Sequence, residues 1–558
     1  MKIYRRMNRI VALLIALVMV ISAGCGAKAP EPTAERRGEE LVEVEAPKEE
    51  SVEGVMTETE TEMEEPAAAA PPQPTAMPRA DGDAGAGPST GGTDEPNDQP
   101  YGDMFFEDYG VNPRIDTEDD HLSTFAVDVD TGAYTVMRSY INDGFLPPDE
   151  SVRVEEYINF FDQDYPPPQD GAFAIHLEGA PSPYEANYHL VRVGLQGYEL
   201  HPEDRKDVVL TFVIDISGSM DRGDRLGLVK QTLELLVNEL RPTDKVGIVV
   251  YGSRGQVYLE PTPVSKSNQI LNAIRKLRPG GATNAEEGLV LAYQQASRNF
   301  ERGAINRVIL CSDGVANVGN TGPDSIMAQI EEHAEDGIYL TTVGFGMGNY
   351  NDVLMEQLAD AGDGFYAYVD DIREAERVFV HDLTSTLQVI ARDAKIQVEF
   401  NPSVVSRYRL IGYENRDVAD EDFRNDAVDA GEIGVGHSVT ALYEVKFHAD
   451  APARQPALIA RVRYEDPDHG EVIEIQEAIA RADIAERFED ASPRFQLTAI
   501  VAQYAESLRH SYWAKESKTT LEDIAWEAAR IAEYLPRDAE VQEFATLAER
   551  AVSLSETK

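Results

Sequence analysis

Short apolar runs alternate with amphipathic helical segments between residues 204 and 390, and this alternation constrains the fold more than any other feature. The apolar runs lie at 208–214, 246–251, 308–311, 338–343 and, more weakly, 365–369. The amphipathic segments lie at 226–240, 268–277, 285–300, 325–333 and 353–358. Apolar strands that alternate with helices predict a parallel sheet covered on both faces. We therefore expect a doubly wound α/β domain over residues 204–390.

Strand patterns flank this α/β segment on both sides. Apolar and polar residues alternate at 173–177 and 189–193, and strand patterns return at 396–400, 408–410, 439–443 and 458–462; these are typical of half-buried strands. The Asp- and Gly-rich stretch 417–436 predicts long surface connections. We expect both flanks to form one β-sandwich into which the α/β domain is inserted. Helical spacing at 495–554 predicts that helices follow the sandwich.

The N-terminus has the features of a secretory signal. Four basic residues precede an apolar run from residue 10 to residue 21, which is too short to span a bilayer comfortably but suits a signal. The sequence Ser-Ala-Gly-Cys at 22–25 resembles the lipobox of bacterial lipoproteins, with Ser22 where the pattern prefers Leu. The resemblance implies lipidation of Cys25 and a lipid-anchored, extracytoplasmic protein. In an organism with two membranes, Gly26 after the cysteine favours the outer membrane. An ordinary cleaved signal with an incidental cysteine is the alternative.

The charge of the chain restricts its partners. With 100 acidic and 50 basic residues the net charge is -50, which argues against nucleic acid, because phosphate binding needs basic surface. Residues 26–100 lack aromatic side chains, so we expect a disordered acidic tether there. This tether holds 19 acidic and five basic residues and residues 1–25 hold four basic ones, so about 40 of the excess negative charges belong to residues 101–558.

These patterns divide the chain into six expected parts. They are a lipoprotein signal peptide at 1–25, a disordered tether at 26–100, an N-terminal region of helices and then strands at 101–203, the α/β domain at 204–390, a β-rich domain at 391–485 and a helical C-terminal region at 486–558. Only two cysteines occur, Cys25 and Cys311, so a disulfide framework is excluded.

Five oxygen-bearing side chains stand where three segments of the α/β domain should meet. Asp215, Ser217 and Ser219 follow the first apolar strand, Thr283 precedes a helix, and Asp313 follows another strand. Loops at the carboxyl ends of parallel strands converge at one edge of the sheet, where ligands bind. Carboxylate and hydroxyl oxygens are hard donors, so they favour Mg²⁺, Mn²⁺ or Ca²⁺ over zinc.

This set of residues resembles the metal-ion-dependent adhesion site of von Willebrand factor type A (VWA) domains, Asp-x-Ser-x-Ser followed by a separate Thr and a separate Asp. The resemblance implies a Rossmann-like VWA fold in which Ser217 and Ser219, with Thr283 in the liganded form, bind the metal directly. Asp215 and Asp313 would hold it partly through water. A Glu or Asp of a partner protein would complete the coordination, and binding would move the last helix of the domain, at about 372–387. For each segment alone, an acid at a helix entry with serine caps is the alternative.

The resemblance covers more of the chain than the metal site. Residues 122–131 and 153–160 look like the segment that precedes the VWA domain in a group of bacterial VWA lipoproteins, and 380–540 is similar to the C-terminal domain of that group. The resemblance implies a cell-envelope binding protein, which captures an acidic protein ligand and meets the membrane through its lipid anchor only. We do not expect an enzyme, because no set of residues in the sequence supports a phosphatase or a protease. An envelope assembly scaffold with a structural or vestigial metal site is the alternative.

Two further motifs have weaker chemical support. The run Asp128-Val-Asp130-Thr131 resembles the nucleophile motif of haloacid-dehalogenase phosphatases, but Gly132 stands where a second hydroxyl is needed. The tripeptide at 222–224 spells an integrin-recognition sequence, yet its loop must serve the metal. We predict neither function.

Overall fold

The computed structural model describes residues 106–556, except 128–129, 202, 315–322, 347–350, 382–386, 427 and 429. The predicted signal at 1–25, with Cys25, and the predicted tether at 26–100 lie outside the described residues. All described residues belong to one unit, Asp83–Lys558. No helix in this part of the chain combines the length and apolar character needed to cross a membrane.

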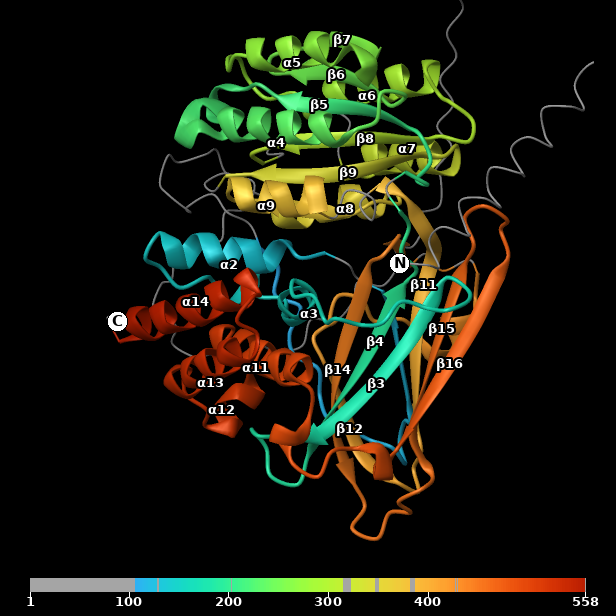
Figure 1. The fold of residues 1–558 in the computed structure, drawn as a ribbon, viewed down its shortest axis with the longest axis vertical. Helices are drawn as coiled ribbons and strands as arrows, with labels where there is room; N and C mark the ends of the chain where they lie inside the picture. The colour runs from blue at the N-terminus through green and yellow to red at the C-terminus, as the bar shows by residue number, and fades with distance from the viewer. Residues whose placement is uncertain are drawn as a thin grey trace, which may run out of the picture. The chain divides into compact units, whose positions relative to one another are not determined.

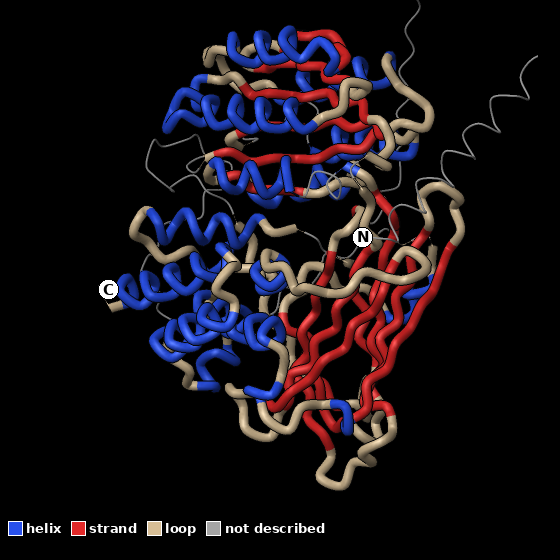
Figure 2. The backbone as a smooth tube through the Cα atoms, in the orientation of Figure 1, coloured by secondary structure: helices blue, strands red, loops and turns tan. Residues whose placement is uncertain are grey.

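A six-stranded sheet with helices on both faces forms the α/β domain (Figure 1, Figure 2). Its strand order is β10-β9-β8-β5-β6-β7. The strands are β5 (Val208–Asp215), β6 (Lys245–Tyr251), β7 (Gly255–Pro263), β8 (Ile305–Ser312), β9 (Ile338–Phe345) and β10 (Tyr366–Val369). The helical segments are η2 (Gly218–Asp224), α4 (Arg225–Glu239), η3 (Val264–Lys266), α5 (Ser267–Lys276), α6 (Ala285–Arg298), α7 (Pro323–Glu335), α8 (Asp352–Asp360), α9 (Ile372–Glu376) and the π-helical turn η4 (Arg377–His381).

Side chains of β5 show why the apolar runs are continuous. Leu210 and Phe212 pack with α4, α5 and α9 on one face, whereas Val213 packs with α6, α7 and α8 on the other. Because successive side chains point to opposite faces, a strand covered on both sides must be apolar throughout. The predicted doubly wound fold is confirmed, with one correction: the sheet is mixed, because β7 runs antiparallel to β6. A short turn at 252–254 returns the chain as a hairpin, which needs no crossover helix.

The flanking strands form two packed sheets, which confirms the predicted sandwich and the insertion of the α/β domain. One sheet has the order β1-β12-β14-β4-β3, and the other has the order β13-β11-β15-β16 with β2 also paired to β11. The strands are β1 (Ile115–Asp116), β2 (Leu122–Ala126), β3 (Phe173–Pro181), β4 (His189–Gly197), β11 (Val389–Phe400), β12 (Val405–Ile411), β13 (Gly431–Gly434), β14 (Ser438–Phe447), β15 (Pro456–Glu465) and β16 (Val472–Ala480). The stretch 417–436 is more than a connection, since it holds β13 and the short helix η5 (Asp420–Arg424).

Helices from both ends of the described chain share one core. The helices that contribute to it are α2 (Gly132–Asn142), α3 (Val154–Asn159), η7 (Phe488–Asp490), α11 (Pro493–Leu508), α13 (Leu521–Tyr534) and α14 (Ala539–Ser555). The same regions of the chain also hold the short helices η1 (Asp149–Ser151), η6 (Arg481–Asp483) and α12 (Tyr512–Ser517). Tyr134 of α2 contacts Phe161, which contacts Phe544 of α14, and Phe544 contacts Tyr504 of α11. Helices α2 and α3 therefore pack in one cluster with the predicted C-terminal helices.

Helix α2 and the residues before it dock on β10, an outer strand of the six-stranded sheet. The Tyr366 N–H donates to Asp130 Oδ1 (3.0 Å), and Thr135 Oγ1 donates to the Tyr368 carbonyl (2.9 Å). Arg377 of η4 donates to Thr131 Oγ1 (2.9 Å). Asp130 and Thr131, the second half of the Asp-Val-Asp-Thr motif, therefore connect the N-terminal region to β10 and to η4.

Candidate functional site

Four of the five predicted metal ligands form one hydrogen-bonded chain at the carboxyl ends of β5 and β8. The Ser217 N–H donates to Asp215 Oδ1 (2.6 Å), and the hydroxyls of Ser217 and Ser219 lie 2.9 Å apart. Ser219 Oγ donates in turn to Asp313 Oδ1 (3.0 Å). Strands β5 and β8 are adjacent and parallel, so the residues that follow them meet at the same edge of the sheet.

Thr283, the fifth predicted ligand, stands on the neighbouring loop. This loop is held against the first one, because the Gly218 N–H donates to the Gly281 carbonyl (3.0 Å) and the Gly280 N–H donates to the Ile216 carbonyl (2.6 Å). Thr283 is partly exposed, and its hydroxyl has no hydrogen-bond partner within the part of the chain that the structure describes. The fold thus holds the Thr283 loop against the loop that carries Ser217 and Ser219.

The two carboxyl groups of the site are buried. Asp215 is 0% exposed and Asp313 is 1% exposed. Burial and the nearby charge of Asp313 raise the pKa of Asp215 to about 6, against hydrogen bonds from Ser217 and Ser312. Burial also raises the pKa of Asp313, although Arg225 and Ser219 oppose it. Because buried like charges are costly, a cation between these carboxylates would stabilise their charged forms.

Three residues at the site were not among the predicted ligands. Ser312 Oγ donates to Asp215 Oδ2 (3.2 Å), and Arg225 Nη1 lies 2.5 Å from Asp313 Oδ2. Tyr251 pairs in register with Asp215 and is fully buried, and burial together with the Asp215 charge raises the pKa of its phenol. Ser312 directly precedes a predicted ligand, which is a usable sequence signal, whereas Arg225 reaches the site only because α4 begins there.

The residues present fit a hard divalent cation. The site offers two carboxylates and the hydroxyls of two or three Ser and Thr residues, all oxygen donors of the kind that Mg²⁺ and Ca²⁺ take. Among the described residues no group of three or more His, Cys, Asp or Glu side chains could hold a metal ion. A cation at this edge would therefore depend on the hydroxyls, and on water, as well as on the two carboxylates.

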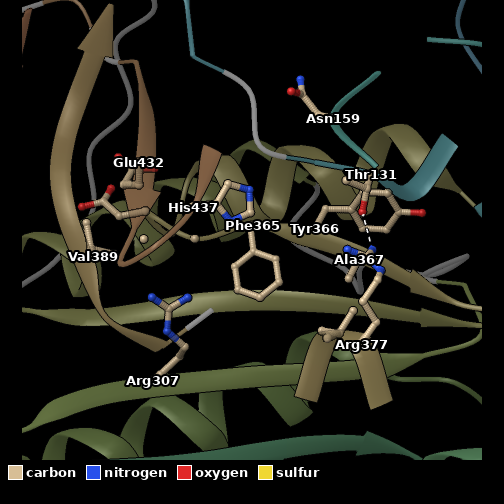
Figure 3. Close-up of a pocket in the computed structure, with 14 residues that line it drawn as sticks. Thr131, Asn159, Arg307, Phe365, Tyr366, Ala367, Arg377, Val389, Glu432 and His437 are labelled. Carbon is tan, nitrogen blue, oxygen red and sulfur yellow. Dashed lines mark hydrogen bonds between the residues drawn. The ribbon is translucent and has the colours of Figure 1, made fainter. Parts of the chain in front are cut away.

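A cavity of about 70 Å³ lies near the other end of β8 (Figure 3). Residues from the α/β domain and from the sandwich line it, among them Arg307, Phe365, Arg377, Glu432 and His437. Arg307 is 1% exposed and donates to Thr341 Oγ1 (2.6 Å), and burial lowers its pKa to about 10. None of the predicted metal ligands lines this cavity, so it is separate from the candidate metal site.

Three protein families match successive parts of the chain. Residues 210–382 match the von Willebrand factor type A domain, and residues 100–192 match a family described as von Willebrand factor. Residues 385–554 match the family described as Uncharacterized protein YfbK, C-terminal. The chain is therefore a VWA-domain protein with a YfbK-like C-terminal domain.

Curated relatives match parts of their own length. Uncharacterized protein YfbK of Escherichia coli (strain K12) is 39% identical over 372 residues, which cover 65% of this chain and 64% of that protein. Uncharacterized protein sll0103 of Synechocystis sp. is 24% identical over 267 residues, 47% of this chain and 62% of that protein. Human inter-alpha-trypsin inhibitor heavy chain H4 is 31% identical over 163 residues, 28% of this chain and 17% of that protein. The chain thus matches less than two thirds of the length of each.

Solved structures that match the chain are distant from it in sequence. A von Willebrand factor type A structure from Catenulispora acidiphila is 14% identical, with a TM-score of 0.39, over 67% of this chain and 89% of that chain. The ArnB paralog VWA2 from Sulfolobus acidocaldarius is 15% identical, with a TM-score of 0.34, over 69% of this chain and 98% of that chain.

Proposed function

We propose that this VWA-domain protein is a binding protein, not an enzyme, which captures an acidic protein ligand through a divalent cation. VWA domains commonly bind proteins. The observation that carries the proposal is the hydrogen-bonded chain from Asp215 through Ser217 and Ser219 to Asp313, because it gathers buried carboxylates and hydroxyls at one sheet edge.

Each predicted ligand has a proposed role toward Mg²⁺, or Mn²⁺ or Ca²⁺. Ser217 and Ser219 bind the cation directly, and Thr283, whose hydroxyl has no partner within the described chain, joins them when a ligand is present. Asp215 and Asp313 hold the cation partly through water. A bound cation supplies an open coordination position that a Glu or Asp carboxylate of the partner fills.

The acidic charge of the protein supports a metal-dependent contact. About 40 excess negative charges on residues 101–558 repel an acidic partner, so the cation is needed to make that contact favourable. Screening of this repulsion by salt should strengthen binding at moderate ionic strength rather than weaken it.

We further propose that the protein is anchored in the cell envelope by a lipid on Cys25, in the outer membrane where the organism has two. The tether at 26–100 would hold the folded part away from the lipid surface. Membrane fractionation of a Cys25→Ser variant tests this anchor: the variant should leave the membrane fraction, and its retention there would contradict the proposal.

Calorimetric titration with Mg²⁺ or Mn²⁺ tests the metal site. The full chain should bind one cation, and Asp215→Asn should abolish binding because it removes a carboxylate without changing the side-chain shape. Asp221→Asn is the matched control, since Asp221 is an exposed acid in the adjacent turn, and it should leave the affinity unchanged. Equal affinity in the Asp215→Asn and unaltered proteins would contradict the assignment.

An envelope scaffold with a structural or vestigial metal site is the other outcome to distinguish. Crosslinking pulldown from an envelope extract, with and without Mg²⁺, separates the two. Partner capture that persists in EDTA and in the Thr283→Ala variant would support the scaffold. Loss of partner capture under both conditions would support metal-dependent capture.

A further inference from the structure

A guanidinium group lies within the candidate metal site. Arg225, the first residue of α4, places Nη1 2.5 Å from Asp313 Oδ2, and the side chains are 11% and 1% exposed. The other oxygen of the same carboxyl, Oδ1, accepts from Ser219 Oγ at 3.0 Å. One oxygen of Asp313 is therefore bonded to a predicted metal ligand, and the other is paired with a cation that belongs to the chain itself.

The position of this guanidinium is set by the backbone beneath it. Gly346 directly follows β9, which neighbours β8, and it has a φ of 80°. A Cβ at Gly346 would lie 2.6 Å from Arg225 Nε, closer than side-chain atoms approach one another. Glycine at this position therefore leaves the space that the Arg225 side chain fills on its way to Asp313.

A fixed positive charge changes the electrostatics of the site in two ways. Asp215 and Asp313 alone would balance a dication, so adding Arg225 leaves the loaded site with one positive charge. The guanidinium also repels a dication that shares Asp313 with it, and this repulsion is strong because the pair is shielded from water. The first effect favours an anionic ligand, and the second weakens binding of the metal alone.

We propose that Arg225 is a specificity-determining residue of the metal site, which lowers its affinity for the bare dication and raises the preference of the loaded site for a carboxylate ligand. This inference rests on the proposed function. Both the Arg225 guanidinium and the bound cation would then determine that the partner is acidic.

The first test measures Mn²⁺ affinity from the electron paramagnetic resonance signal of free Mn²⁺ at pH 7.5. Arg225→Gln should bind Mn²⁺ about tenfold more tightly than the unaltered chain, because the repulsion is removed. Arg225→Lys keeps the positive charge, so its affinity for Mn²⁺ should be close to that of the unaltered chain. Lys266→Gln, which makes the same charge change at an exposed residue outside the site, is the control and should have no effect.

A second variant keeps the inference testable if Arg225→Gln folds poorly, which its melting temperature will show. Gly346→Ala retains the guanidinium but places a methyl group against Nε, so it should displace the side chain from Asp313. It should likewise tighten Mn²⁺ binding by several-fold. Unchanged affinity in a folded Gly346→Ala protein would count against the inference.

The second test uses acetate as the carboxylate probe. Relaxation of the acetate methyl protons by protein-bound Mn²⁺ reports whether acetate reaches the cation. At equal Mn²⁺ occupancy, the enhancement should be clearly smaller in Arg225→Gln than in the unaltered chain, and equal enhancement would overturn the proposed preference.

The outcomes separate this inference from the function on which it rests. Mn²⁺ binding with equal affinity in the unaltered and Arg225→Gln proteins leaves the metal site standing and overturns the role of Arg225. Binding by Arg225→Gln alone supports the role of Arg225 and contradicts metal-dependent capture by the natural chain. No binding by either protein overturns both.

Discussion

Glu506 of α11 is a buried acid that belongs to no candidate site, and it makes stability depend on pH. It is 2% exposed, and it accepts from Arg509 (2.8 Å) and from Arg409 (3.2 Å). Burial acts to raise the pKa of Glu506, but the two guanidinium groups outweigh it, and the pKa lies below the ordinary value of 4.5. A lowered pKa contributes stability at pH values above 4.5, and this contribution is lost as the pH falls through the lower, folded-state value.

Glu506→Gln should therefore destabilise the protein by about 1.5–3 kcal/mol at pH 7, because it removes charge-assisted hydrogen bonds from two buried guanidinium groups. Each of these groups keeps a second carboxylate, Glu414 for Arg509 and Glu444 for Arg409. The loss should shrink below pH 4, where the unaltered protein itself begins to lose this contribution. Urea unfolding at pH 7 and at pH 3.5 measures both values. Glu516→Gln, at an exposed position of α12, is the control, and an equal loss from Glu506→Gln at the two pH values would contradict the account.

Sequence patterns identify most residues of the candidate site but not all of them. Asp215, Ser217, Ser219 and Asp313 follow strands whose apolar runs are unmistakable, so their convergence can be predicted. The pairing of Arg225 with Asp313 cannot, because it depends on where α4 begins and on the space above Gly346. Both are properties of three-dimensional packing rather than of residue spacing.

Among the elements, the docking of α2 on β10 shows how an outer strand is covered. Side chains of the N-terminal region satisfy the Tyr366 N–H and the Tyr368 carbonyl, which would otherwise face outward from the sheet. A Cβ at Gly132 would lie 2.3 Å from Cε1 of Tyr366. The close approach of helix and strand thus requires glycine at the start of α2.

Gly132→Ala should destabilise the protein by about 1–3 kcal/mol, because the added methyl group overpacks a buried contact. Amide hydrogen exchange in β10 should become faster as the helix moves away from the strand. Ser139→Ala, at a partly exposed position on the same helix, serves as the control and should change stability by less than about 0.5 kcal/mol. Equal effects of the two changes on stability would show that the close contact at Gly132 does not contribute to it.

Sequence patterns identify the strands with continuous apolar runs or regular apolar–polar alternation, and the strands that they miss are short or lie at sheet edges. The apolar runs of β5, β6, β8 and β9 are continuous, whereas β7 and β16 are partly exposed edge strands with mixed composition. Strand β13 has only four residues, two of them glycine, and it forms because β11 offers it a pairing edge. Of the predicted last helix at 372–387, α9 and η4 are described and 382–386 lie outside the described residues, so its movement stays a prediction.

Across the whole molecule, Arg138 joins the VWA domain to the helices of both ends of the described chain. From α2 it pairs with Asp370 (2.6 Å) and Glu374 (2.8 Å) of the VWA domain and with Glu543 (3.2 Å) of α14. Its side chain and those of Asp370 and Glu374 are all less than 10% exposed. Buried ion pairs of this kind are costly to break from one side, because the partner charges stay buried.

Arg138→Met should lower stability by about 3–5 kcal/mol, since it leaves Asp370 and Glu374 without their shared guanidinium. We expect calorimetric unfolding to broaden or divide as the VWA domain and the C-terminal helices lose this connection. Arg373→Met is the control: Arg373 also pairs with Glu543 but is 61% exposed, so its loss should cost less than about 1 kcal/mol. Equal and small effects from both changes would mean that Arg138 does not couple the two parts.

Binding of a divalent cation at the carboxyl ends of β5 and β8 is tested most directly by anomalous diffraction from crystals soaked in Mn²⁺. We expect one strong anomalous peak in contact with the hydroxyls of Ser217 and Ser219, between Asp215 and Asp313. An anomalous map without a peak at this position, with Arg225 still paired to Asp313 in the soaked crystals, would contradict it.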